Sequence, residues 1–183
     1  MSGTGRALIV YETMFGNTER IARAIRDGLR TYVQADMVPV NRAPDVVPGD
    51  VRLLVVGGPT HAFSMSRPST RKDAWQQGDV VMPTEVGIRE WLDALERAGG
   101  NRPRDLRVTT FDTRIAKVRR LPGSAARSAA KLLRRMGYRM IGTSESFFVN
   151  EMTGPIRDVE IERARRWGAE LGRLTTGAAR VAG

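Results

Sequence analysis

The sequence predicts an α/β fold, a single doubly wound domain in which helices cover both faces of a parallel sheet. Apolar runs bounded by turn residues alternate with segments of helical periodicity along the chain. These runs are hydrophobic at consecutive positions, as in strands buried on both faces. No repeat or linker interrupts the alternation, so residues 1–183 are expected to form one domain that frays at residues 177–183.

Five strands and four helices are expected from this pattern. The strands are expected at residues 7–11, 35–40, 51–57, 106–111 and 140–149. The helices are expected at residues 21–29, 84–99, 124–136 and 158–174. Thr84 and Ser124 are the expected N-caps of the second and third helices. The connection Ser64–Pro83 is unusually long, and a short helix, a lid and a partner surface all stay open for it.

The composition excludes several kinds of chemistry. The chain has no cysteine, which rules out disulfides, thiolate metal sites and a catalytic thiol, and leaves redox chemistry to a bound cofactor. His61 is the single histidine, so no transition-metal site is expected. No apolar run approaches the ~20 residues that span a bilayer, and the short polar start is unlike a signal peptide. A cytoplasmic protein is therefore expected.

Positive charge is concentrated in one part of the chain. The net charge is +10, and the excess lies beyond residue 100. The stretch Arg114–Arg139 carries nine basic residues and no acidic one. Three interpretations stay open: a solvated helix face, a docking surface for an acidic protein or a dinucleotide phosphate, and a nucleic-acid surface. No nucleic-acid-binding motif supports the third, so no nucleic-acid partner is expected.

The residues that carry chemistry are expected beyond the carboxyl ends of the strands, where ligands bind to open parallel sheets. The first such loop reads Thr13-Met14-Phe15-Gly16-Asn17-Thr18 and leads directly into a helix. Hydroxyl, amide and backbone N–H donors at a helix N-terminus suit a phosphate dianion. The chain lacks a P-loop lysine and a G-x-G-x-x-G motif, which favours a monophosphate over a triphosphate or a dinucleotide. Alternatively, the hydroxyls of Thr13 and Thr18 bind no phosphate and only cap the start of the helix.

This loop resembles the phosphate loop of the flavodoxin-like family. Gly57-Gly58-Pro59-Thr60-His61 and Phe111-Asp112-Thr113-Arg114 lie where that family has its second and third flavin loops. The resemblance implies a five-stranded sheet of order 2-1-3-4-5 and the cofactor flavin mononucleotide (FMN). Within that family the chain resembles the basic, arginine-rich flavodoxin-domain proteins of actinobacterial type.

The resemblance also implies a set of FMN-binding residues. Thr13, Asn17 and Thr18 would hold the phosphate, together with N–H groups from Met14, Phe15, Gly16 and Asn17. The flavin ring and ribityl chain would be bordered by Pro59, Thr60, His61, Ala62 and Phe63. The third loop would contribute Asp112, Thr113 and Arg114.

Two residue types depart from typical flavodoxins. The third loop has no aromatic residue between Asp112 and Arg120 to stack on the flavin, so one side of the ring is expected to be open. Phe15, Phe63 or His61 could cover the other side. The basic residues after Arg114 replace the acidic surface of typical flavodoxins. A flavin ring with one open side would let a nicotinamide or a substrate approach it. The missing aromatic residue is equally expected if the chain has lost its flavin site.

We therefore expect an FMN-binding redox protein that passes electrons to or from a partner protein, a nicotinamide or a quinone. An electron carrier and a small oxidoreductase both fit. An acidic redox partner or NAD(P)H could dock along Arg114–Arg139. The alternative is a flavodoxin fold without flavin that acts as a docking module through its basic C-terminal half. Trp75, Trp91 and Trp167 are expected to pack in the interior, and Glu12 to point away from the phosphate loop.

Overall fold

A parallel sheet forms the centre of the molecule. The computed structural model describes residues 5–61, 64–78, 80–81, 85–99, 102–103, 105–118, 120, 122–151 and 153–181. The six strands have the order β2-β1-β3-β4-β5, with β6 also paired to β4. The first four strands are β1 (Arg6–Tyr11), β2 (Ala35–Pro39), β3 (Val51–Pro59) and β4 (Arg107–Ile115). The predicted α/β fold and the strand order 2-1-3-4-5 are confirmed.

The last predicted strand is divided in two. β5 (Arg139–Met140) pairs with the start of β4, and β6 (Glu145–Val149) pairs with its end. One strand over residues 140–149 was therefore a wrong prediction. Gly142 lies between the two strands with a φ of 64°, a left-handed conformation that strands do not contain. The order is unaffected because both pieces pair with the same neighbour.

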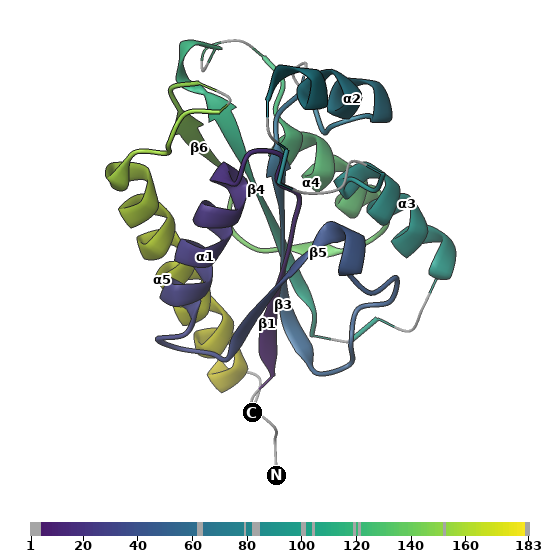
Figure 1. Ribbon diagram of the computed structural model, residues 1–183. Coiled ribbons are helices and arrows are strands. Elements are labelled where there is room, and N and C mark those ends of the chain that lie inside the picture. The colour runs from purple at the N-terminus through teal and green to yellow at the C-terminus, as the bar shows by residue number, and fades with distance from the viewer. Residues whose placement is uncertain are drawn as a thin grey trace.

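Helices cover the two faces of the sheet in pairs (Figure 1). α1 (Asn17–Leu29) and α5 (Asp158–Val181) lie on one face, and α3 (Ile88–Ala98) and α4 (Ala125–Arg135) on the other. α5 extends to Val181, beyond its predicted end at residue 174, since no proline interrupts it. Short 3-10 helices, η1 (Val40–Arg42) and η2 (Ala116–Val118), follow β2 and β4.

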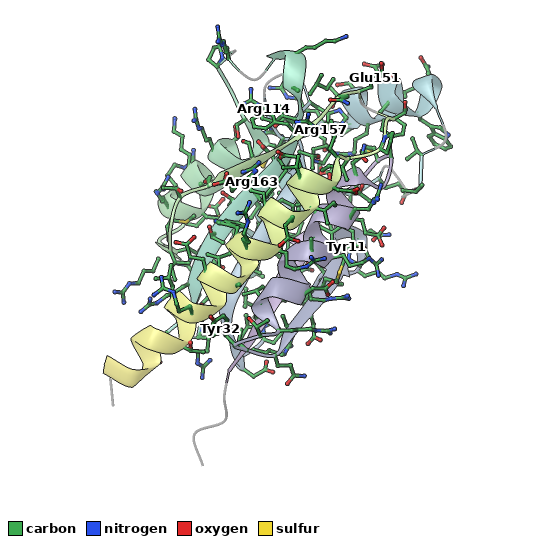
Figure 2. All side chains as sticks on the ribbon, turned by 90° about the vertical axis from the view of Figure 1, so that its left-hand side faces the viewer. Tyr11, Tyr32, Arg114, Glu151, Arg157 and Arg163 are labelled. Atoms are coloured by element: carbon green, nitrogen blue, oxygen red, sulfur yellow. The ribbon has the colours of Figure 1, made fainter. Side chains whose placement is uncertain are left out.

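α1 and α5 approach each other until their backbones touch. A Cβ on Gly28 would lie 2.0 Å from the Arg165 carbonyl oxygen, and one on Gly168 would lie 2.2 Å from that of Ile25. Both positions therefore require glycine. Seen from this side, α5 runs along α1, in yellow and purple (Figure 2). Beneath them, the rings of Phe111, Phe147 and Trp167 meet edge to face at centroid distances of 6.1 to 6.4 Å.

α3 begins later than predicted. Its N-cap is Gly87, whose N–H donates to Glu90 Oε2 over 2.8 Å. The prediction of a start at Thr84 was wrong, and Thr84 itself lies outside the described residues. Gly99, with a φ of 54°, ends the helix as expected. Ser124 caps α4, because its hydroxyl accepts from Arg127 N at 3.2 Å.

The long connection after β3 contains a helix, α2 (Pro68–Gln77), which lies beyond the carboxyl edge of the sheet in Figure 1. Trp75 on α2 is 66% exposed, so the prediction that it packs in the interior was wrong. Trp91 is buried on α3 and donates from its indole nitrogen to Pro44 O over 3.0 Å, as a buried indole requires. Within the described ranges, no helix is long and apolar enough to cross a membrane.

Candidate functional site

A cleft lies at the carboxyl edge of the sheet, where the connections after β1, β3 and β4 meet. It opens to solvent and is lined by apolar side chains together with a few polar groups, the make-up typical of small-molecule sites. The residues that line it are Thr13, Met14, Phe15, Asn17, Thr18, Pro59, Thr60, His61, Thr113, Ile115 and Val149. Nine of these eleven belong to the site predicted from the sequence.

The β1–α1 loop forms one end of the cleft. Gly16 has a φ of 84°, which only glycine adopts readily, and it is the N-cap of α1. Its N–H donates to Thr13 Oγ1 over 3.0 Å and closes the loop into a tight turn. The N–H groups in the first turn of a helix have no partner within it, and they carry the positive end of the helix dipole. This end of the cleft is therefore suited to an anion.

A hydroxyl pair joins the first loop to the third. Thr18 Oγ1 and Thr113 Oγ1 lie 2.8 Å apart, both buried, on α1 and β4. A hydroxyl donates one hydrogen and accepts at two lone pairs. One of the pair therefore keeps its hydrogen for another acceptor, and Thr13 likewise keeps its own while accepting from Gly16. The loop retains O–H donors at the anion end of the cleft.

Asn17 has a second role that the sequence did not predict. Its side-chain amide donates to Gly154 O over 2.9 Å, in the loop between β6 and α5. The residue thus lines the cleft and also holds this loop against the start of α1. Its contact with a phosphate stays a prediction.

The β3–α2 connection forms the other side of the cleft. Thr60 N donates to Thr113 O over 3.0 Å, and backbone hydrogen bonds join His61 to Ser64. Burial, together with the charge of Arg71, lowers the pKa of His61 below its ordinary value. The imidazole is therefore neutral at pH 7 and offers one donor and one acceptor. The predicted site residues Ala62 and Phe63 lie outside the described residues.

Asp112 and Arg114 do not line the cleft. Asp112 is fully buried, and its Oδ2 accepts from Thr60 Oγ1 at 2.8 Å, Ser124 Oγ at 2.5 Å and Ala126 N at 3.0 Å. It therefore holds the N-terminus of α4, and the expectation that it approaches a cofactor requires correction. β4 runs to Ile115 rather than Phe111, and strand alternation places Asp112 and Arg114 on the face opposite Thr113.

The extended strand also explains two residues that sequence reasoning missed. Ile115 and Val149 end β4 and β6, are paired in register, and add apolar surface to the cleft. A continued alternation of apolar and polar residues through Thr113 and Ile115 was the available signal.

Glu12 points away from the anion end, as expected, into a buried polar network. Its carboxylate accepts from Ser66 Oγ at 2.5 Å and from Ile88 N at 2.8 Å. Arg71 donates to Ser66 Oγ over 2.9 Å and pairs with Glu90 at 3.0 Å. The network ties α2 and the start of α3 to the end of β1. Burial raises the pKa of Glu12, against the opposing effect of its hydrogen bonds and of Arg71.

Among the described residues, no three histidine, aspartate or glutamate side chains come together as metal ligands. The donors of the cleft are hydroxyls, backbone N–H groups, the Asn17 side-chain amide and one imidazole. Such donors suit an anionic group, and the apolar residues of the cleft suit a flat, uncharged ring.

Comparison with known proteins supports the fold. No protein-family model and no curated protein matches the sequence. Among solved structures, a flavodoxin from the domain Archaea matches with a TM-score of 0.63 and 17% identity over 93% of this chain and 99% of that one. Flavodoxin 1 from Bacillus cereus matches with a TM-score of 0.63 and 15% identity, covering 90% and 95% of the two chains.

A third match is a short-chain flavodoxin associated with a bacterial microcompartment, with a TM-score of 0.64 and 16% identity over 93% of this chain and 98% of that one. At these identities the likeness concerns the fold. The chain thus has a flavodoxin-like fold, with its cleft at the carboxyl edge of the sheet.

Proposed function

We propose that the chain binds FMN non-covalently in the cleft and passes electrons to or from a partner. The observation that carries this proposal is the make-up of the cleft. Hydroxyl and N–H donors of the Thr13–Thr18 loop lie at the start of α1, and apolar side chains together with Thr60 and His61 also line the cleft. A flavin mononucleotide needs both kinds of surface, because it carries a phosphate dianion and a flat ring.

The phosphate would lie against the start of α1. The hydroxyls of Thr13, Thr18 and Thr113 and the first-turn N–H groups are the donors, and the helix dipole favours the negative charge. The carboxylate of Glu12 is directed to the other side of the loop, into its network with Ser66. Among the residues that the structure describes, those that line the cleft therefore include no acidic side chain to oppose a dianion.

The ring would lie among Met14, Phe15, Pro59, Ile115 and Val149. These side chains exclude water from a flat apolar surface, and the neutral imidazole of His61 can hydrogen-bond a polar edge in either direction. A bound flavin supplies the capacity to accept and release electrons. The chain's residues orient it and leave one side open to a partner, because the cleft opens to solvent.

Titration with FMN and with riboflavin tests this proposal. The fluorescence of FMN should be quenched on binding. The double variant Thr13→Ala/Thr18→Ala should weaken FMN binding by roughly 100-fold or more, since each of the two lost charge-assisted hydrogen bonds is worth about 1.5–3 kcal/mol. Riboflavin lacks the phosphate, so its affinity should change little.

Thr31→Ala is the matched control. Its hydroxyl donates to Gly28 O at the opposite end of α1, and its loss should leave FMN affinity unchanged. No binding of FMN to the unaltered chain would refute the proposal. An equal loss for FMN and riboflavin in the double variant would show that these hydroxyls do not hold a phosphate.

A further inference from the structure

The outer surface of α4 carries unpaired positive charge. Arg127, Lys131, Arg134 and Arg135 are all exposed, and the helix contains no acidic residue. None of the four forms an ion pair with any residue that the structure describes. We name these four residues the α4 cationic face.

Some cations on the other side of the sheet have acidic partners on their own helix. On α1, Arg23 pairs with Glu19 at 2.7 Å and Arg26 with Asp27 at 3.0 Å. On α5, Arg165 pairs with Glu162 at 2.6 Å. Arg20 on α1 and Arg166 and Arg173 on α5 are also exposed and have no ion pair among the described residues, but these helices carry acidic residues as well. α4 differs because it holds four exposed cations and no acidic residue, so the positive field of the α4 cationic face is not offset along its own helix.

α4 is attached directly to the cleft. Ala125 N donates to Thr60 Oγ1 over 2.9 Å, and Thr60 lines the cleft. The helix has 11 residues, and at ~1.5 Å per residue its whole length lies within roughly 16 Å of that attachment. Lys117 and Arg120, both exposed, lie in the connection that leads from β4 to α4. A partner held on α4 would therefore lie beside the cleft.

We propose that the α4 cationic face docks the acidic surface of another protein. Its cations stand at helical spacings of three and four residues on a convex surface, with no aromatic residue in the helix to stack on a base. A carboxylate-rich protein surface fits this arrangement better than a nucleic acid does. This docking does not depend on the proposed FMN site. Only the exchange of electrons with the docked protein rests on that site.

Two triple variants of equal charge test the docking on the flavin-free chain. Lys131→Gln/Arg134→Gln/Arg135→Gln removes three charges from α4, and Arg23→Gln/Arg26→Gln/Arg165→Gln removes three charges that are ion-paired. Binding of labelled poly-L-glutamate is measured by fluorescence anisotropy at low and at physiological ionic strength. The α4 variant should bind roughly tenfold or more weakly at low salt, and the control should stay within about twofold of the unaltered chain.

An equal loss in both variants would mean that net charge alone attracts the probe, and would overturn the proposal. So would unchanged binding in the α4 variant. Parallel titrations use duplex DNA and vesicles of anionic lipid. A larger effect of the α4 variant on either of these than on poly-L-glutamate would assign the face to that ligand and overturn an acidic protein as its occupant. Because no flavin is present, failure of the FMN proposal does not affect the result.

Discussion

The two helical layers of this sheet use the same residue types in different ways. In the α1–α5 layer, Gly28 and Gly168 bring the backbones into contact. At the surface of this layer, Arg163 lies over the Phe147 ring at 4.4 Å and pairs with Glu160 at 2.7 Å (Figure 2). In the opposite layer, α4 packs through buried alanines and presents cations without partners. Several arginines of the first layer thus form ion pairs or ring contacts, whereas the exposed cations of α4 form no ion pair with a described residue.

The largest effect should come from the close contact of α1 and α5. Gly168→Ala places a methyl group against the Ile25 carbonyl, where the backbone has to shift. We expect it to lower the free energy of unfolding by roughly 3 kcal/mol, as in severe overpacking.

Gly177→Ala is its control on the same helix. A Cβ there meets nothing within 4 Å, so it should raise the free energy of unfolding by about 0.5–1 kcal/mol through the unfolded chain. Denaturant unfolding of both variants measures the difference. Equal effects at the two positions would contradict the close approach of the helices.

A smaller effect, a pH dependence of stability, is expected on the side of the sheet covered by α3 and α4, where the buried network of Glu12 lies. Burial raises the pKa of Glu12 above its ordinary value of 4.5, so the folded chain holds this proton more tightly than the unfolded chain. The stability that the carboxyl contributes is therefore complete below pH 4.5 and is lost as the pH rises through the folded pKa.

Glu12→Gln lacks this dependence and keeps a side chain of the same shape. The stability of the unaltered chain relative to Glu12→Gln should fall as the pH rises from 4.5 towards 7, as measured by denaturant unfolding at several pH values. A relative stability that rises with pH would mean that Arg71 and the hydrogen bonds outweigh burial.

The smallest effects should have opposite signs in the two layers. Lys131 lies four residues from Arg127 and Arg135, so Lys131→Gln removes repulsion and should raise the free energy of unfolding by about 0.5 kcal/mol at low salt. Arg23→Gln breaks the pair with Glu19 and should lower it by about 0.3–0.5 kcal/mol. High salt should abolish both changes. Equal signs would contradict the contrast between the layers.

Much of the fold could be predicted because local patterns determine it. Buried strands read as continuous apolar runs, and the alternation with helices requires parallel crossovers. The division of the last strand could not be read this way, because Met140 to Val149 is apolar at both ends and the left-handed turn at Gly142 is a property of the folded backbone. The start of α3 depends on Glu90 reaching back to Gly87, which competed with a plausible cap at Thr84.

The cleft was predicted less completely than the fold. The loop after β1 could be read because its donors follow a strand and precede a helix. Asp112 was assigned to the cleft because β4 was expected to stop at Phe111, and a longer strand turns its carboxylate to α4 instead. The partners of Glu12 come from residues 66, 71 and 88, whose proximity depends on tertiary packing.

Mapping FMN onto the chain by amide chemical shifts tests the central claim most directly. On titration of the ¹⁵N-labelled chain, the amides from Met14 to Thr18 and those of Thr60, His61 and Ile115 should shift together and saturate. Signals from Lys131 to Arg135 should be unchanged. Shifts confined to α4 would show that FMN is attracted only by the cations there, and no shifts at saturating FMN would mean that the cleft does not bind it.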